Sequence, residues 1–239
     1  MTAQPRLPPV GLLGGTFDPV HFGHLRLAEE ARDHLGLMQV RWVPAGAPPH
    51  RSTPLASARE RLEMVRLAVA GNPAFLVDEA EADSQGLSYT VDTLVRQRKA
   101  LGPARPLVLV LGLDAFRGLH SWHRWHDLLQ LAHIALAGRP GYPLDTESLA
   151  PELASEFAAR KLVDASALAG SPAGAIVQFD MTPLAISATD IRRRLAHGMS
   201  ARYLLPDQVL DYIARNRLYS STPETHGRQN AAANRGQRP

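Results

Sequence analysis

The residues best suited to chemistry stand near the start of the chain, in the run GGTFDPVHFGH at positions 14–24. An apolar stretch at 10–13 comes directly before this run and predicts a buried strand, and a helical pattern follows it. Gly14 and Gly15 let the backbone turn between the two elements and approach a ligand closely. The N–H groups that open the helix, with its positive dipole end, then face the space beyond the strand. The junction therefore predicts a binding site for phosphate.

Two imidazoles belong to the same junction. His21 and His24 are three residues apart, so a helix that begins near Phe22 holds them close together on the side that faces the anion. Gly23 leaves room there for a flat base or a sugar. The run contains neither the P-loop pattern nor G-x-G-x-x-G, the patterns of other phosphate-binding turns. The alternative interpretation is a glycine-rich turn with two exposed histidines.

A second run, LAISATDIRRRL at 184–195, predicts another helix start of the same kind. Ser187 is suited to cap this helix, Thr189 adds a hydroxyl, and Arg192 lies further along the first turns. A helix N-terminus with hydroxyls and an arginine can hold the outer phosphates of a triphosphate. Taken by itself, the run is equally well explained as a capped basic helix.

Together the two runs resemble the H-x-G-H nucleotidyltransferase superfamily. The first run is similar to the pattern G-G-T-F-D-P-x-H-x-G-H of the nicotinate mononucleotide adenylyltransferase family, and 186–192 is similar to the superfamily pattern I-S-[ST]-T-x-I-R. Ala188 stands where that pattern has Ser or Thr, which removes one hydroxyl. The resemblance spans about 10–219 and implies transfer of an adenylyl group from ATP to nicotinate mononucleotide, giving deamido-NAD and pyrophosphate.

The resemblance also implies a role for each site residue. His21, His24 and Arg192 are the expected catalytic groups, because they can stabilise the charge that moves onto the leaving pyrophosphate. The residues expected to contact ATP are Gly14, Gly15, Thr16, Phe17, Gly23, Gly112, Asp114, Ser187 and Thr189. Those expected to contact the acceptor are His50, Arg51, Thr90, Trp122 and Arg139. Mg²⁺ is expected to enter with ATP, held by phosphate oxygens and by no side-chain cage.

Several of these roles have a structural alternative. Asp114, which follows a predicted strand, could hold a ribose or cap a helical turn. Trp122 could cover the nicotinate ring or pack in the core, as is expected of Trp125. The start of 88–94 could meet the nicotinate carboxylate near Thr90, or could be an ordinary helix start capped by Ser88 or Thr90. The loop at 43–51 could close over the acceptor phosphate or lie rigidly on the surface.

Histidines at 120, 123 and 126 recur at every third residue and raise the question of a metal site. Metal-binding helices more often use a spacing of four, and no carboxylate or cysteine stands at a matching spacing. We therefore expect a solvated or ring-packing stripe there.

Strands alternate with helices along the chain, which predicts an α/β fold: a doubly wound, mostly parallel Rossmann-like sheet with helices on both faces and a short C-terminal helical extension. Predicted strands are 10–13, 39–43, 75–77, 106–111, 133–137 and 175–179. Predicted helices are 22–34, 56–70, 90–101, 122–130, 146–160, 188–196 and 206–216. One domain is expected over 9–219, between a flexible N-terminus at 1–8 and a disordered tail at 220–239. In such sheets ligands bind beyond the carboxyl ends of the strands, near the switch in strand order.

Composition agrees with this interpretation. The chain has 239 residues, no cysteine and a net charge of +3, which suits a cytoplasmic enzyme of polyanionic small molecules. We expect no membrane insertion and no nucleic-acid partner. Nicotinamide mononucleotide, phosphopantetheine or flavin mononucleotide remain alternative acceptors, and a non-catalytic nucleotide sensor or a nucleic-acid-binding module are alternatives of another class. A homo-oligomer is left open.

Overall fold

The computed structural model describes residues 7–48, 53–84, 86–141 and 144–220. A seven-stranded sheet forms the centre, and each of its pairings is parallel. Its strand order is β3-β2-β1-β4-β5-β7-β6. The strands are β1 (Val10–Gly15), β2 (Gln39–Pro44), β3 (Phe75–Val77), β4 (Leu107–Gly112), β5 (His133–Gly138), β6 (Lys161–Leu162) and β7 (Ile176–Asp180). The predicted α/β class and parallel sheet are therefore confirmed.

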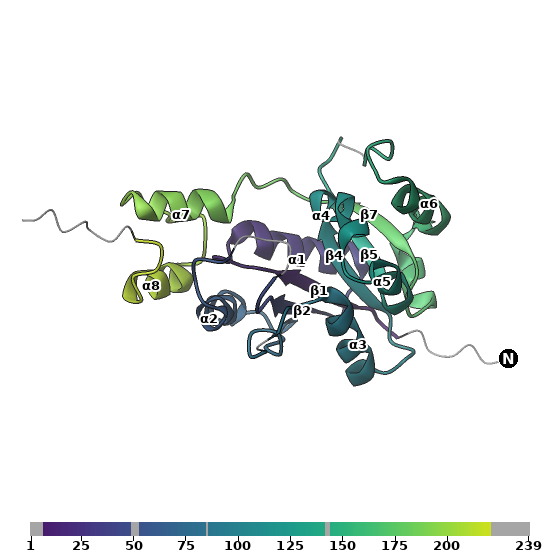
Figure 1. Cartoon of the computed structure of the whole chain (residues 1–239), viewed down its shortest axis with the longest axis horizontal. Coiled ribbons are helices and arrows are strands. Elements are labelled where there is room, and N and C mark those ends of the chain that lie inside the picture. Colours follow the sequence, from purple (N-terminus) through teal and green to yellow (C-terminus); the bar gives the residue numbers. More distant parts are fainter. Residues whose placement is uncertain (1–6, 49–52, 85, 142–143, 221–239) are drawn as a thin grey trace, which may run out of the picture.

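Helices cover both faces of the sheet, and the last two helices stand together at one end of it (Figure 1). One face packs against α1 (Phe22–Leu35), α2 (Ala58–Val69) and the 3-10 helix η2 (Ala165–Gly170). The other packs against α3 (Thr90–Leu101), α4 (Leu113–Arg117), the 3-10 helix η1 (Leu119–Ser121), α5 (Trp125–Leu131) and α6 (Pro151–Arg160). The extension consists of α7 (Ala188–Ala196) and α8 (Asp207–Arg215).

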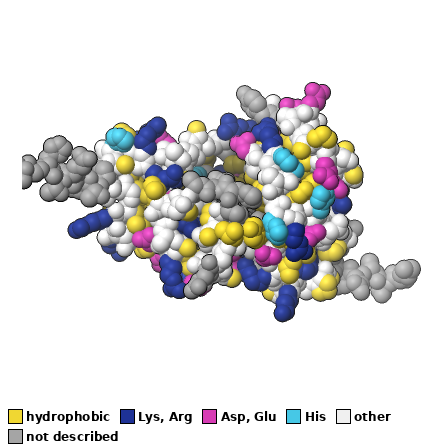
Figure 2. All heavy atoms as spheres, viewed as in Figure 1, with side chains coloured by type: hydrophobic (Ala, Val, Ile, Leu, Met, Phe, Trp, Pro, Cys, Tyr) yellow, Lys and Arg dark blue, Asp and Glu magenta, His cyan; other side chains and the backbone are white. Residues whose placement is uncertain are grey.

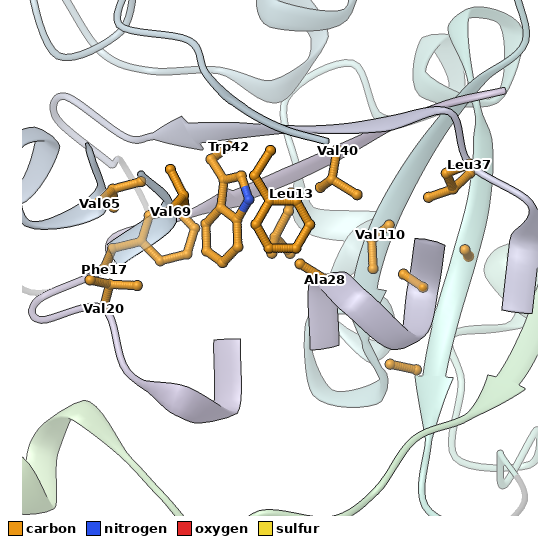
Figure 3. Packing of buried hydrophobic residues seen from close by; sticks show 14 of the residues in the cluster. Leu13, Phe17, Val20, Ala28, Leu37, Val40, Trp42, Val65, Val69 and Val110 are labelled. Carbon is orange, nitrogen blue, oxygen red and sulfur yellow. The ribbon is translucent and has the colours of Figure 1, made fainter. Parts of the chain in front are cut away.

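The alternation of side chains along each strand divides the core into two layers. In β4, Leu107 and Leu109 point to the layer under α3 and α5, whereas Val108 and Val110 point to the layer under α1 and α2. Figure 3 shows part of this second layer, where Phe17 and Trp42 pack beside Val65 and Val69 of α2. Both layers are apolar, as a parallel sheet that is covered on both faces requires.

Two predicted helices begin more than two residues later than expected. The helix predicted from residue 122 starts at Trp125, because Arg124 has a left-handed backbone (φ 51°) that a continuous helix does not contain. The helix predicted from residue 146 starts at Pro151, whose ring suits the first helical position. The short elements α4, η1, η2 and β6 were not expected, since none of them is long enough to show a period.

The strand order reverses at β1, and the two central strands separate there. β1 pairs with β4 only from Val10 to Leu12, whereas it pairs with β2 as far as Gly15. The pairing of β4 with β5 likewise continues to Gly112. The carboxyl ends of β1 and β4 therefore diverge and leave a crevice, which is where ligands bind in doubly wound sheets.

Candidate active site

Two glycines line the crevice between β1 and β4. Gly14 and Gly112 are exposed at the ends of these strands. A Cβ atom placed on either of them would have none of the described atoms within 4 Å. A side chain at either position would therefore project into open space at the carboxyl end of its strand. Both residues stand where the sequence predicted contacts to ATP.

The next residues of the motif turn the chain around a buried aromatic ring. Phe17 has a left-handed backbone (φ 51°), and its ring packs against Trp42 at 5.4 Å and His24 at 5.1 Å between centroids. A Cβ on Gly15 would lie 2.9 Å from that ring, so only glycine fits there. The expected contact of Phe17 with ATP can thus come only from its backbone, because the core holds its side chain.

His21 and His24 form a stacked pair at the start of α1. Their ring centroids are 3.8 Å apart with an angle of 28° between the planes. His24 Nδ1 accepts a hydrogen bond from the backbone N–H of His21 (3.3 Å), which leaves the proton of a neutral ring on Nε2. Burial lowers the pKa of His21 to about 4, so this ring is neutral at physiological pH. Its buried Nδ1 has no hydrogen-bond partner among the described residues.

Gly23 explains how the two rings fit. A Cβ at this position would lie 3.0 Å from His21 Nδ1 and 3.8 Å from the carbonyl oxygen of Ile186. The sequence predicted that Gly23 makes room for a base or sugar. In the structure the space beside it holds the His21 ring and the chain that leads into α7.

The starts of α1 and α7 lie side by side, because Gly23 of α1 adjoins Ile186, which comes just before α7. Arg192 of α7 donates from Nη1 to the backbone carbonyl of Asp18 at 2.6 Å. The backbone N–H of Phe22, the first residue of α1, donates to the carbonyl of Leu204 at 3.0 Å. In the view of Figure 2 the surface is hollowed between the α7 end of the molecule and the α4 region. Two positive helix ends therefore converge near one crevice.

The start of α7 has the expected cap. Ser187 Oγ accepts from the backbone N–H of Asp190 at 3.1 Å, and Thr189 Oγ1 lies 3.4 Å from Arg192 Nη2. Asp190 pairs with Arg193 and Arg194 on the outer side of the helix. Arg192 takes no part in these pairs and contacts the loop at 16–21 between β1 and α1, the motif loop.

On the acceptor side, two segments are joined by direct contacts. Ser88 Oγ accepts from the backbone N–H groups of Gly46 (3.0 Å) and Ala47 (3.3 Å), which ties the loop after β2 to the start of α3. The N-cap of α3 is Tyr89, so the alternative in which Ser88 or Thr90 caps this helix is wrong. Thr90 is the first residue of α3, as expected.

The segment around Trp122 adjoins the same helix start. The ring of His123 lies 4.5 Å from that of Tyr89, and Trp122 is half-buried against the core layer under α3. Trp125 is buried in that layer, as expected. Trp122 therefore precedes a residue whose ring contacts the N-cap of α3, and its own side chain is partly exposed.

Asp114 and Arg139 follow two adjacent strand ends. Asp114 is in the first turn of α4, with its side chain 99% exposed and paired to Arg117 at 2.8 Å. The N-cap of α4 is Gly112, so the capping role considered for Asp114 is wrong. Arg139 is exposed just past β5. His50 and Arg51 lie outside the described residues.

The family model described as cytidylyltransferase-like matches residues 12–194. A protein of Dechloromonas aromatica (strain RCB), named "Probable nicotinate-nucleotide adenylyltransferase", is 59% identical over 214 residues, which are 90% of this chain and 99% of that protein. The chain belongs to this family of nucleotidyltransferases. A protein of the same name from Aeromonas salmonicida (strain A449) is 48% identical over 213 residues, 89% of this chain and 98% of its own length.

Solved structures agree on the fold. The Plasmodium falciparum nicotinic acid mononucleotide adenylyltransferase complexed with NaAD superposes with a TM-score of 0.65 at 17% identity, over 89% of this chain and 97% of that one. The same protein complexed with APC gives a TM-score of 0.63, also at 17% identity, over the same 89% and 97%. At this identity the likeness establishes the Rossmann-like architecture alone. It agrees with the family assignment made from the motifs.

Two site residues of this nucleotidyltransferase were not expected from the sequence. Arg61 of α2 is buried, and its guanidinium donates to the carbonyls of Thr16 (2.7 Å), Ala45 (2.6 Å) and Gly46 (2.8 Å). It thereby fixes the loops after β1 and β2 against each other. The second is Asp18, whose carboxylate accepts from the backbone N–H of Leu55 at 2.9 Å. Only the position of Asp18 inside the motif run signalled a role for it.

The histidine stripe carries no metal cluster. Within 7–48, 53–84, 86–141 and 144–220, no three His, Cys, Asp or Glu side chains are grouped to hold an ion. His126 pairs with Glu152 at 3.0 Å and stacks on Trp125, which agrees with the expected ring-packing role. None of the helices in the same residues is long and apolar enough to span a membrane.

Proposed function

We propose that the chain transfers an adenylyl group from ATP to nicotinate mononucleotide, and releases deamido-NAD and pyrophosphate. The observation that carries the proposal is the convergence of α1 and α7 at the crevice between β1 and β4, with His21, His24 and Arg192 between them. The names of relatives up to 59% identical support the same reaction.

The chemistry is a single displacement. A phosphate oxygen of the acceptor forms a bond to the α-phosphorus of ATP, and the bond from that phosphorus to pyrophosphate breaks. Because the acceptor phosphate is ionised at neutral pH, it needs no general base. The protein has to bring two anions together and to stabilise the charge that moves onto the leaving group.

The proposed catalytic groups are donors at the site of that charge. His24 presents N–H at Nε2, since its Nδ1 accepts from the backbone. Arg192 supplies a permanent positive charge from α7, and the N-terminus of each helix adds backbone donors. His21 stays neutral and is stacked beneath His24, so it fixes the position of that ring without a second positive charge.

The remaining assignments follow the strand ends. Gly14, Gly15, Thr16, Gly23 and Gly112 would border the nucleotide, Asp114 would accept from the ribose hydroxyls, and Ser187 and Thr189 would meet the outer phosphates. Thr90, Trp122 and Arg139, together with His50 and Arg51, would hold the acceptor. Mg²⁺ would arrive on ATP and neutralise phosphate charge.

Release of pyrophosphate from ATP and nicotinate mononucleotide tests the proposal. We expect His24→Ala to lower turnover by about 10²–10³-fold, the usual effect of removing one donor to a developing charge. His34→Ala is the matched control, because it changes a histidine at the far end of the same helix. If His24→Ala keeps nearly full turnover, the catalytic assignment is wrong.

The same assay decides among acceptors. Nicotinamide mononucleotide, flavin mononucleotide and phosphopantetheine are offered under identical conditions, and the highest kcat/KM identifies the acceptor. We expect nicotinate mononucleotide to rank first, because the N-terminus of α3 beside Trp122 suits a ring that bears a carboxylate. A higher rank for any other compound would overturn the choice of acceptor and leave the nucleotidyl transfer itself in place.

A further inference from the structure

We propose that Tyr219, far from the motif in sequence, is a positioning residue for nucleotide binding: it holds the Asp18 carboxylate so that Arg192 is available to the phosphates. The inference rests on the proposed function for its ligand, a nucleoside triphosphate. Tyr219 itself lies behind the motif loop and need not touch the substrate. It would act through Asp18.

Asp18 joins several distant segments. Its carboxylate accepts from Tyr219 Oη at 2.6 Å and from the backbone N–H groups of Leu55 at 2.9 Å and Ala56 at 3.2 Å. The residue is only 5% exposed, so water does not replace a donor that is lost. The loop before α2, the motif loop and the C-terminal segment are therefore fixed at one carboxylate.

Arg192 is the cation that α7 places beside Asp18. Its Nη1 donates to the Asp18 carbonyl at 2.6 Å and lies 3.9 Å from Asp18 Oδ2, beyond hydrogen-bond distance. While Tyr219 donates to Asp18 Oδ1, the ion pair between Arg192 and Asp18 Oδ2 stays long. Without the phenol, Asp18 Oδ1 would lose its hydroxyl donor and the carboxylate would draw Arg192 into a shorter ion pair, so the triphosphate would have to compete for the guanidinium.

The backbone of the C-terminal segment places the Tyr219 phenol against Asp18. Arg217 (φ 53°) and Tyr219 (φ 60°) both have left-handed backbones, which side-chain-bearing residues rarely adopt. Burial, followed by the hydrogen bond to Asp18, raises the pKa of Tyr219 above its ordinary value. The phenol therefore stays protonated at neutral pH and can donate. Strained backbone at a non-glycine residue is a feature that often accompanies function.

Calorimetric binding of a non-hydrolysable ATP analogue tests the role of Tyr219 without any acceptor. We expect Tyr219→Phe to weaken binding by about tenfold, the effect of a lost hydrogen bond to a charged group. KM for the acceptor should stay unchanged. Tyr212→Phe is the matched control, because it removes a phenol from α8 that lies against α2. Equal affinity in Tyr219→Phe and the wild type would overturn the proposal.

A double-mutant cycle separates positioning from a loss of folding. In an Arg192→Ala background, Tyr219→Phe should change nucleotide affinity by less than about twofold, because the group through which Tyr219 acts is gone. A tenfold loss in that background as well would assign Tyr219 a merely structural role. If the wild type binds the analogue but releases no pyrophosphate with nicotinate mononucleotide, the proposed reaction fails while the binding data still decide the role of Tyr219.

Discussion

The stacked histidines show how two similar side chains in one turn acquire different properties. His21 is 6% exposed, and burial lowers its pKa to about 4, whereas His24 is half-buried and is oriented by a backbone hydrogen bond. Because the His21 ring is neutral, it can stack closely on the His24 ring, which is proposed to contact an anion. Two imidazolium ions at 3.8 Å would repel each other.

The low pKa of His21 predicts how stability changes with pH. The unfolded chain binds a proton at His21 near pH 6.5, but the folded chain does so only near pH 4. The free energy of unfolding should therefore fall as the pH is lowered through this window, by about 3 kcal/mol from this residue. His21→Asn removes that contribution and keeps a residue suited to the N-cap of α1. Urea unfolding at pH 7, 6, 5 and 4 measures it.

The difference in unfolding free energy between the wild type and His21→Asn isolates the contribution of His21 from that of other titrating groups. Burial also lowers the pKa of His133, which hydrogen-bonds to the carbonyl of Ser171, and this contribution is common to both proteins. We expect the stability advantage of the wild type to shrink steadily toward pH 4. Two curves that stay parallel over the whole range would show that His21 titrates normally.

The sequence predicted the residues proposed to contact the ligand, but it did not predict the residues that hold them in position. His21, His24, Ser187 and Arg192 occur in recognisable runs, and the structure brings all four to the converging helix starts. Arg61, Asp18 and Tyr219 act through carbonyls or side chains of distant segments. Since Asp18 and Tyr219 are 201 residues apart, no local pattern could have paired them.

At the scale of elements, a buried carboxylate links α1 to the chain that carries α7. Glu30 accepts from both the backbone N–H and the hydroxyl of Thr182, each at 2.6 Å. Burial alone would raise the pKa of Glu30, but the hydrogen bonds from Thr182 and Arg26 outweigh it and hold the pKa below its usual value. This contact anchors the segment after β7, so it helps to set where α7 begins.

A double-mutant cycle on this contact measures the coupling between the two helices. Thr182→Val should lower the free energy of unfolding by about 1–3 kcal/mol, because it leaves the buried Glu30 carboxylate without the Thr182 hydroxyl. Glu30→Gln should lower it as well, because the hydrogen bonds from Thr182 lose their charged acceptor. Together they should cost clearly less than the sum of the two. ATP affinity should fall in both single variants, since the start of α7 loses its anchor. Chemical denaturation and calorimetry provide the two readouts.

An additive result would contradict this account of the contact. Arg26→Ala serves as the control, because Arg26 also pairs with Glu30, at 2.6 Å, but its side chain is 47% exposed and it lies on the outer side of that pair. Arg26 and Glu30 belong to the same helix, so this pair does not join α1 to the segment that leads to α7. Arg26→Ala should therefore leave ATP affinity unchanged.

The elements themselves were predictable where a period was long enough to be recognised. The strand expected at 10–13 and the helix expected at 22–34 differ from β1 and α1 only by one or two residues at an end. The predicted bounds are wrong where a single residue sets the start of a helix, as the left-handed Arg124 does for α5. Prediction also fails where an element is too short for a pattern, as with β6.

At the scale of the whole molecule, the position of the site follows from strand order. Alternating strands and helices predicted a parallel sheet, but they did not specify that β4 would be the neighbour of β1. That neighbour is set by which apolar faces α1 and α3 cover, on opposite sides of the sheet. The separation of β1 from β4 beyond Leu12 then creates the crevice, to which distant loops contribute.

The crevice predicts a substitution that affects binding and leaves folding intact. Gly14→Val places a side chain at the end of β1, where none of the described atoms lies within 4 Å of the new Cβ. Valine suits a strand, so the thermal midpoint should stay within a few degrees of the wild type. The branched side chain would occupy the open space at the carboxyl end of β1, beside the crevice, so affinity for the ATP analogue should fall by at least about tenfold. Thermal unfolding and calorimetry measure the two effects.

Gly71→Val is the control that ties this effect to the crevice. A Cβ at Gly71 would also have none of the described atoms within 4 Å, but this glycine lies between α2 and the amino end of β3, an outer strand of the sheet. The substitution should leave ATP affinity unchanged. If both variants bind the analogue as the wild type does, the nucleotide does not enter between β1 and β4. The separation of these strands would then have a structural role alone, and the converging helix starts would need another ligand.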